Sequence, residues 1–303
     1  MINHPEREQR MSGIDLHTHS LASDGTHSPR ELVREAKKND LEAIALTDHD
    51  TTRGLKEAIQ AGYEYGIEVV PGCELSVEYR YGYMHIIGLW LPENPLKLNE
   101  TLQDLRTKRH TRNKQIILKL QKLGIDIDYE QVKGLAGEAS VGRPHIARLL
   151  MQKGVVPSLE SAFTVYLGKS ARAYAPKEKL RPEEAIQVLQ QENATVILAH
   201  PFSLDLNYSD LEKEIARLKS FGLDGLEVYY PGHTPEQKRV YLQLASRMDL
   251  LPSGGSDFHG TVKPRILLGR GTGSLYVPYD LLAAMKKRRK SKGYWITERT
   301  TKN

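Results

Sequence analysis

Two histidines near the start of the chain, His17 and His19, have the spacing of a metal-binding pair. They follow a short apolar segment that ends at Leu16. Side chains at positions i and i+2 of an extended backbone point to the same side, so both imidazoles can face one metal ion. Asp24 follows in an Asp-Gly-Thr turn that can return a carboxylate to the same place. A His-x-His pattern also arises by chance in loops, so the rest of the chain must decide whether these two histidines bind a metal ion.

Further imidazoles and carboxylates follow other predicted strands, such as the apolar segment 43–46 before His49. In a barrel of alternating strands and helices, the C-terminal strand ends all open on one face, where such enzymes place their chemistry. His85 lies on the second arm of a hairpin predicted about Tyr81-Gly82. The complete candidate set of six imidazoles and three carboxylates is His17, His19, Asp24, His49, Glu74, His85, His200, Asp257 and His259.

Nine such residues exceed what one divalent ion uses, because about four to six ligands complete a site and a carboxylate can bridge two ions. We therefore expect two or three ions. Nitrogen and oxygen donors without thiolate suit zinc, manganese or iron rather than calcium or magnesium alone. Clustered ions ~3.5–4 Å apart are typical of phosphoryl transfer to water, because they acidify a bridging water and neutralise the phosphoryl oxygens.

The motifs together resemble those of the PHP (polymerase and histidinol phosphatase) family. In chain order they are His17-Thr-His19, Asp24-Gly-Thr, Thr-Asp48-His49-Asp50, Gly-Cys-Glu74, His85, Ala-His200-Pro and Ser-Asp257-Phe-His259. The resemblance implies an α/β fold, a distorted (β/α)₇ barrel, with a site for three divalent ions, manganese first and zinc or iron(II) as alternatives. By motif it assigns His17, His19, Glu74 and Asp257 to one ion, Glu74, His85 and His200 to a second, and Asp24, His49 and His259 to a third.

A mostly helical segment interrupts the alternation of strands and helices. It begins with a long basic helical pattern over 101–123, and no convincing strand follows before about residue 177. We predict a first barrel part over residues 1–97, an inserted helical substrate domain over 98–177, and a second barrel part with a basic C-terminal tail over 178–303.

The net charge of +5 is unevenly distributed. Residues 98–177 hold 14 Lys and Arg against 7 Asp and Glu, and residues 286–303 hold 8 against 1, so each segment carries +7. The remainder therefore carries −9. An acidic body suits a site for several cations, and basic segments suit a polyanionic substrate. The basic tail is equally consistent with a solvated helix end.

The inserted segment carries a narrower resemblance in Gly142-Arg143-Pro-His145-Ile-Ala-Arg, Tyr166-Leu-Gly and Ala173-Tyr-Ala-Pro-Lys177. It is similar to the PHP subgroup that dephosphorylates 3′,5′-nucleoside bisphosphates or AMP, or degrades short RNA from a 5′-phosphate end. The substrate-binding candidates are Arg143, His145, Lys177 and Ser140. Arg143 has the fork geometry that suits a phosphate, although an arginine at a helix start can also form a salt bridge.

The expected function is hydrolysis of a phosphate ester by a metal-bridging hydroxide. The residues expected to act in catalysis are His17, His19, Glu74, Asp257 and Arg143. The expected substrate is a nucleotide or a short single-stranded 5′-phosphorylated oligonucleotide. Two alternatives stay open: a small-molecule phosphatase such as a histidinol-phosphatase, and an amidohydrolase-type deaminase, which usually has a bridging lysine. A non-catalytic metal-binding module is a third alternative, which the intact ligand set disfavours.

The composition, 39% hydrophobic and 27% charged, is typical of a soluble globular protein. A single cysteine, Cys73, and the lack of an apolar run of about 20 residues predict a cytoplasmic protein without a membrane partner or an obligate protein partner. Asp48 and Asp50 either orient His49 or cap the helix that follows, and Glu227 can support the site. The histidines expected on the surface are His4, His27, His110 and His233.

Overall fold

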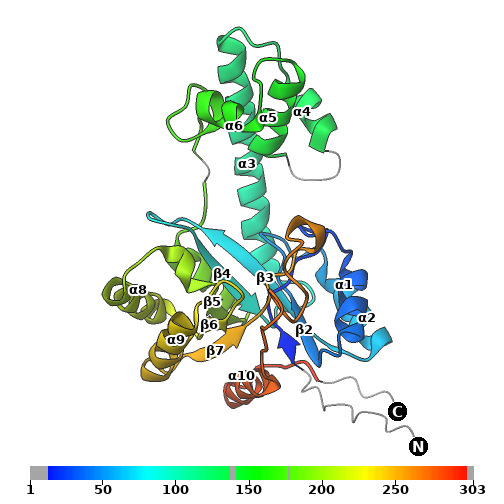
Figure 1. Ribbon diagram of the computed structural model, residues 1–303, viewed down its shortest axis with the longest axis vertical. Helices are drawn as coiled ribbons and strands as arrows, with labels where there is room; N and C mark the ends of the chain where they lie inside the picture. The colour runs from blue at the N-terminus through cyan, green and yellow to red at the C-terminus, as the bar shows by residue number, and fades with distance from the viewer. Residues whose placement is uncertain (1–12, 137–140, 177, 299–303) are drawn as a thin grey trace, which may run out of the picture. The chain divides into compact units, whose positions relative to one another are not determined.

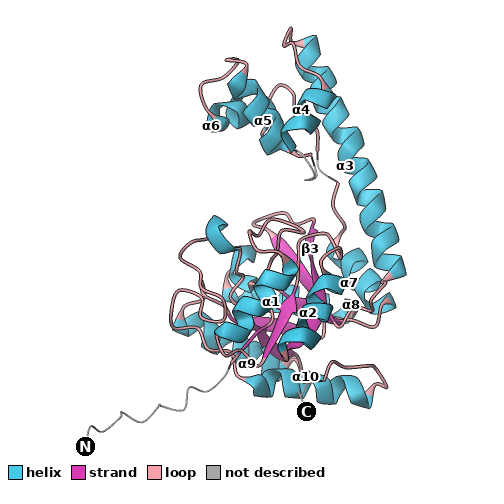
Figure 2. Ribbon diagram, turned by 90° about the vertical axis from the view of Figure 1, so that its right-hand side faces the viewer, coloured by secondary structure: helices cyan, strands magenta, loops and turns pink. Residues whose placement is uncertain are grey.

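The structure is a computed structural model that describes residues 13–136, 141–176 and 178–298. At its centre is a seven-stranded sheet in which each strand neighbours the next along the chain, in the order β1 to β7. The sheet curls, and helices cover its outer face (Figures 1 and 2), which confirms the predicted α/β class and distorted barrel. The strands are β1 (Ile14–Asp15), β2 (Ala43–Leu46), β3 (Glu68–Val77), β4 (Met84–Leu89), β5 (Thr195–Leu198), β6 (Gly225–Tyr229) and β7 (Leu251–Gly254).

The barrel is distorted because β4 runs antiparallel to both of its neighbours, whereas the other strand pairs are parallel. The sequence alone predicts two separate extended runs here, 68–70 and 75–80, with the first ending before Pro71-Gly72. That prediction was wrong, because β3 continues through these residues to Val77 and changes partner there. Its first half pairs with β2 and its second half with β4. Gly72 permits this change, because a Cβ at this position would lie 2.8 Å from the carbonyl oxygen of Gly88.

The first and last strands are joined by hydrogen bonds just beyond their ends. The amide of Leu16 donates to the carbonyl of Gly254 at 3.1 Å. The carboxylate of Asp15, fully buried, accepts the amides of Ser256 and Gly269, each at 2.8 Å, and the hydroxyl of Ser256 at 2.5 Å. Burial raises the pKa of Asp15 to about 6 despite these hydrogen bonds, so Asp15 is mostly ionised at neutral pH. Asp15 thus fixes the loop after β7 beside the loop after β1.

The helices of the barrel begin and end at clear sequence signals. Ser28 and Glu31 form a capping box before α1, with Pro29 in the first turn. Gly66 ends α2 in the left-handed conformation at φ 64°. These helices are α1 (Pro29–Lys38), α2 (Leu55–Tyr65), α7 (Pro182–Gln191), α8 (Tyr208–Phe221), α9 (Pro235–Arg247) and α10 (Tyr279–Ser291).

The chain divides into two compact units, one of residues 1–99 with 180–303 and one of residues 100–179. The second unit has its own apolar core, which includes Ile116, Leu120, Ile146 and Leu150. Its elements are α3 (Leu96–Lys122), which begins in the first unit, then α4 (Tyr129–Ala136), α5 (Arg143–Gln152), α6 (Leu159–Ala162) and a π-helical turn (Phe163–Leu167). Across the described part of the chain, no helix is long and apolar enough to cross a membrane.

The basic residues of α10 bind the barrel rather than project uniformly into solvent. Lys286 Nζ lies 2.6 Å from the buried carboxylate of Glu68. Arg289 is buried, donates to the carbonyl of Asn193 at 2.8 Å, and has its guanidinium carbon 4.9 Å from the centre of the Trp90 ring. A large part of the charge of this helix therefore holds the C-terminal segment on the barrel.

We expect Asp15→Ala to lower the free energy of unfolding by about 2 kcal/mol, measured by urea denaturation. The substitution leaves the buried amides of Ser256 and Gly269 without their acceptor, at a cost of ~1–3 kcal/mol each, partly offset because a buried charge is removed. Ser256→Ala keeps both amide hydrogen bonds and should cost less than half as much. Equal stability of Asp15→Ala and the wild type would show that this contact does not hold the strand ends together.

Candidate metal centre

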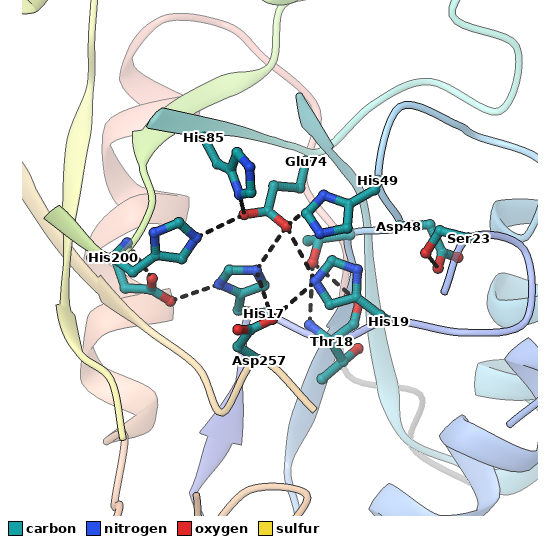
Figure 3. A network of polar contacts seen from close by, with 12 residues as sticks. His17, Thr18, His19, Ser23, Asp48, His49, Glu74, His85, His200 and Asp257 are labelled. Atoms are coloured by element: carbon teal, nitrogen blue, oxygen red, sulfur yellow. Dashed lines mark hydrogen bonds and ion pairs between the residues drawn. The ribbon is translucent and has the colours of Figure 1, made fainter. Parts of the chain in front are cut away.

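The predicted ligands come together at the end of the sheet where the parallel strands finish. His85 is the second residue of β4, and it joins the others because β4 is antiparallel, so that its beginning lies beside the ends of its neighbours. Figure 3 shows this arrangement around Glu74. The residues of the set that it labels are His17, His19, His49, Glu74, His85, His200 and Asp257.

Glu74 is the centre of the cluster. Its carboxylate is fully buried, and five imidazoles surround it. The nitrogens closest to Oε2 are His17 Nε2 and His19 Nε2, both at 3.2 Å, and His49 Nδ1 at 3.1 Å. The nitrogens closest to Oε1 are His85 Nδ1 at 2.9 Å and His200 Nε2 at 3.1 Å.

Asp257 and Asp24 supply the other carboxylates. Asp257 Oδ1 lies 3.2 Å from His19 Nε2 and 3.4 Å from His259 Nδ1. Asp24 Oδ1 lies 3.3 Å from His259 Nε2, and its Oδ2 lies 4.0 Å from His49 Nε2. The side chain of Asp24 is 53% exposed, so this carboxylate borders solvent, whereas Glu74 is enclosed.

The potential ligand atoms form four overlapping groups, within each of which all atoms lie within 4.8 Å of one another. The groups are His19, Asp24, His49 and His259; His17, His19 and Asp257; His17, Glu74 and His200; and His49, Glu74 and His85. Glu74 thus meets His85 in one group and His200 in another, whereas the family resemblance placed both histidines on one ion. Which residues share an ion stays a prediction.

Neighbouring side chains orient two of the imidazoles. His17 Nδ1 lies 3.0 Å from Glu227 Oε1, a carboxylate that can only accept, so Nδ1 carries the proton. The hydroxyl of Ser203 donates to the carbonyl of Tyr83 at 2.9 Å, so it accepts the proton on His200 Nδ1 at 3.0 Å. Both histidines can then present an Nε2 lone pair toward Glu74, which is the tautomer that binds a metal ion.

Several buried polar atoms fit a cation in this space. His17 Nε2, both ring nitrogens of His19, His49 Nδ1 and Glu74 Oε2 are buried and lack a partner with hydrogen-bond geometry among the described residues. Buried polar atoms are normally paired, because an unpaired group loses its hydration without compensation. Imidazole nitrogens and carboxylate oxygens are also the donors that divalent transition metals accept.

The pKa values follow from the same geometry. Burial opposes the charged form of His19, but the carboxylates of Asp257 and Glu74 outweigh burial and raise its pKa to about 9. Burial likewise opposes the charge on Glu74, but the surrounding imidazoles hold the pKa of this carboxyl well below its usual range. Burial lowers the pKa of His49 to about 4. Without an ion, charge in the cluster is therefore balanced by protons on the histidines.

Asp48 has a role different from the two considered from the sequence, which were to orient His49 or to cap the helix that follows. Its carboxylate accepts the amide of Ser20 at 2.7 Å, the hydroxyl of Ser20 at 2.6 Å and the hydroxyl of Ser23 at 2.5 Å. These bonds fix the loop that carries Asp24. Asp50 accepts the amide of Ser76 at 3.0 Å.

Besides Ser203, two further residues at the site were not predicted from the sequence. The hydroxyl of Tyr230 donates to Asp257 Oδ2 at 3.0 Å, and Lys263 Nζ lies 2.6 Å from the same oxygen. Asp257 therefore turns Oδ1 toward the imidazoles while Tyr230 and Lys263 hold Oδ2. The only sequence signal is position, because Tyr230 directly follows β6 and Lys263 follows His259 by four residues.

The candidate substrate residues lie in the second unit. Arg143 Nη1 donates to the carbonyl of Leu167 at 3.0 Å. His145 Nδ1 accepts the amide of Gly142 at 3.1 Å and so caps the start of α5. Burial, followed by the charge of Arg148, lowers the pKa of His145. Ser140 and Lys177 lie outside the described residues.

One histidine expected on the surface is buried. The ring of His233 lies 4.8 Å from that of Tyr241 and 5.1 Å from that of Tyr230, and its Nδ1–H donates to the carbonyl of Val228. This hydrogen bond and the aromatic contacts compensate for its burial. Cys73 is buried, and burial raises its pKa well above the usual range, which fits the expected role of a small packed residue.

Two curated bacterial proteins are similar to this chain over most of its length. A 5′-3′ exoribonuclease of Haemophilus influenzae is 38% identical over 245 residues, which cover 81% of this chain and 89% of that protein. A 3′,5′-nucleoside bisphosphate phosphatase of Chromobacterium violaceum is 31% identical over 250 residues, which cover 82% of this chain and 88% of that protein.

The fold is similar to that of a solved protein from Bifidobacterium adolescentis, described as a putative metal-dependent phosphoesterase. The TM-score is 0.72 at 31% identity, and the match covers 91% of this chain and 96% of that one. Residues 15–155 match the PHP domain. Since the matched relatives, the fold and the clustered His, Asp and Glu side chains agree, the chain belongs to the PHP-domain family of metal-dependent phosphoesterases.

Proposed function

We propose that this protein hydrolyses phosphate esters of nucleotides, as a 3′,5′-nucleoside bisphosphate or AMP phosphatase, a 5′→3′ exoribonuclease on short 5′-phosphorylated RNA, or both. The observation that carries the phosphoesterase chemistry is the convergence of five imidazoles on the buried carboxylate of Glu74. The names of the relatives in Haemophilus influenzae and Chromobacterium violaceum support a nucleotide substrate. A deaminase of the amidohydrolase type is disfavoured, because Glu74 occupies the centre where that class usually has a bridging lysine.

We assign up to three divalent ions, manganese or alternatively zinc or iron(II), to this cluster. The residues that would hold them are His17, His19, Asp24, His49, Glu74, His85, His200, Asp257 and His259. Divalent ions bound there supply an acidified water and neutralise charge on the phosphoryl oxygens. Glu227 and Ser203 keep His17 and His200 in the metal-binding tautomer.

Lys263 has a place suited to the incoming phosphate. Its Nζ contacts Asp257 Oδ2, while 40% of its side chain stays exposed at the edge of the cluster. A cation at this position adds positive charge at the edge of the cluster, which favours the approach of a phosphate ester. Tyr230 holds the same carboxylate oxygen by a neutral hydrogen bond. The two side chains thus orient Asp257 and bring a positive charge to the edge of the site.

The second unit supplies an arginine cluster for substrate phosphates. Burial, followed by the charges of Arg143 and Arg109, lowers the pKa of Arg112 to about 10. Three guanidinium groups near one another repel, and a bound phosphate relieves that repulsion through charge-assisted hydrogen bonds. Arg143 has the planar fork needed for a bidentate contact. We therefore assign phosphate recognition to Arg143 and its neighbours, with His145, Ser140 and Lys177 as further candidates.

Glu74→Gln should reduce turnover of a nucleoside bisphosphate by at least ~10³-fold and lower the number of bound manganese ions. The substitution replaces a charged carboxylate by a neutral amide, and this carboxylate is assigned to two ions at once. Metal content by mass spectrometry and steady-state kinetics measure both effects. Glu78→Gln, on an exposed residue just beyond β3, is the matched control. Normal metal content together with normal turnover in Glu74→Gln would refute the shared-ligand assignment.

Manganese affinity of the metal-free protein should rise with pH up to about 9. The sign follows from the raised pKa of His19, because its proton is bound below pH 9 and must leave before the ring can bind a metal ion. The rise should approach about tenfold per pH unit for each proton released. Calorimetric titration in two buffers of different ionisation enthalpy counts these protons. Affinity that stays constant between pH 6 and 9 would contradict the assignment of His19 as a ligand.

RNA with a 5′-phosphate should be degraded faster than the same RNA with a 5′-hydroxyl. Arg143→Ala should lower kcat/KM on the 5′-phosphorylated RNA by an amount that corresponds to a loss of about 2–4 kcal/mol of transition-state stabilisation. The manganese content should stay unchanged. Lys133→Ala, on an exposed residue of α4, is the control. Equal rates on the two RNAs, or release of nucleotides from the 3′ end, would overturn the 5′→3′ assignment and leave the metal centre untouched.

A further inference from the structure

The tip of the hairpin between β3 and β4 carries a group of exposed aromatic side chains. Tyr81 is 65% exposed and Tyr83 is 46% exposed, and Tyr79 and Arg80 precede them. Figure 1 shows this hairpin extending beyond the neighbouring strands of the sheet. Tyr81 in particular keeps most of its surface in water, so packing within the barrel does not account for this residue.

Tyr83 connects this group to the metal centre. The centre of its ring lies 5.5 Å from the ring of His85 and 5.5 Å from the ring of His200. Both histidines contact Glu74. The half-exposed ring of Tyr83 therefore lies directly beside the residues assigned to the metal ions, with part of its surface open to a ligand.

The position of Tyr83 is fixed by its backbone. Its amide donates to the carbonyl of Ser203 at 3.0 Å, and its carbonyl accepts the hydroxyl of Ser203, which also accepts from His200 Nδ1. The hairpin packs so closely here that a Cβ on Gly82 would lie 2.0 Å from the Ser203 carbonyl oxygen. One serine thus holds both a metal-ligand candidate and the ring beside it, and the distance between them is set before any substrate binds.

The outer part of the hairpin has the features of a stacking surface. The rings of Tyr79 and Tyr81 meet edge to face at 6.0 Å, and the guanidinium carbon of Arg80 lies 5.6 Å from the centre of the Tyr81 ring. Single-stranded nucleic acids bind to such surfaces, because every base has a π-face and arginine adds both a cation–π contact and a charge for the backbone. Base stacking of this kind is tolerant of sequence.

We propose that Tyr83 stacks on the base of the nucleotide whose phosphate is hydrolysed, and that Tyr79, Arg80 and Tyr81 bind the adjoining nucleotide of a single-stranded chain. This inference rests on the proposed function, because it needs a substrate with a base next to the scissile phosphate. It predicts a preference for nucleotides over phosphate esters without a base, and little discrimination among the four bases.

Tyr83→Ala tests the first contact with two substrates, adenosine 3′,5′-bisphosphate and the corresponding abasic 3′,5′-bisphosphate. We expect KM for the nucleotide to rise by about 10- to 100-fold, the size of one lost stacking contact, with kcat within about twofold and KM for the abasic compound unchanged. Tyr83→Phe keeps the ring and should behave as the wild type. Tyr63→Ala is the control, because Tyr63 is an exposed tyrosine near the end of α2 and not part of the hairpin.

The binding of a 5′-phosphorylated trinucleotide that contains 2-aminopurine gives a second readout, because the fluorescence of this base responds to stacking. Tyr81→Ala should weaken its binding and leave the mononucleotide unaffected. Equal loss on the nucleotide and the abasic compound would assign Tyr83 to support of His200 alone, and no loss on either would exclude the contact. If the wild type fails to hydrolyse any nucleotide, the proposed function is wrong, while the fluorescence experiment still decides whether the hairpin stacks on bases.

Discussion

The structure depends on a negative charge held in the interior. The carboxylate of Glu74 is enclosed on all sides, and an isolated buried carboxylate would be strongly destabilising. Five imidazoles compensate for this charge, yet several of their nitrogens face oxygen atoms without the geometry of a hydrogen bond. In the absence of ions, protons on the histidines balance the negative charge of the cluster. Divalent cations suit the same nitrogen and oxygen atoms, because one cation can accept lone pairs from several of them at once. The position of Glu74 thus connects the stability of the fold to its chemistry.

One irregular region of the sheet encloses the carboxylate of Glu74. A regular barrel of parallel strands would leave Glu74 in a loop after β3, where a carboxylate is free to turn toward water. Here β3 continues past Pro71 and Gly72 and pairs with the antiparallel β4, so Glu74 is fixed opposite Ile87. The same antiparallel strand carries His85 to the cluster and places the Tyr83 ring beside it. Departure from the regular barrel is therefore what encloses the central carboxylate.

Much of the site could be predicted from the sequence because its ligands are tied to local patterns. His17 and His19 follow a strand at alternate positions, and motif order identifies Glu74 and Asp257. The continuation of β3 could not be predicted, because Pro71-Gly72 is also typical of a turn and only the pairing with β4 decides between the two. Ser203, Tyr230 and Lys263 are ordinary residues in sequence, and their roles depend on contacts made between distant segments.

The net charge of a segment likewise does not predict its role, because a net count does not show which charges are already compensated. Two segments carry +7 each, but at least four of the eight basic residues of 286–303 are bound within the barrel unit. Lys286 pairs with Glu68, Arg288 with Asp249 and Lys292 with Asp224, while buried Arg289 binds backbone carbonyls. Only charges without such partners can attract a polyanion over a distance. In the second unit, burial and, after it, the charges of Arg143 and Arg109 lower the pKa of Arg112, so positive charge there is only partly compensated. A large part of the charge counted for the C-terminal segment is therefore already compensated within the barrel unit and does not act on a distant anion.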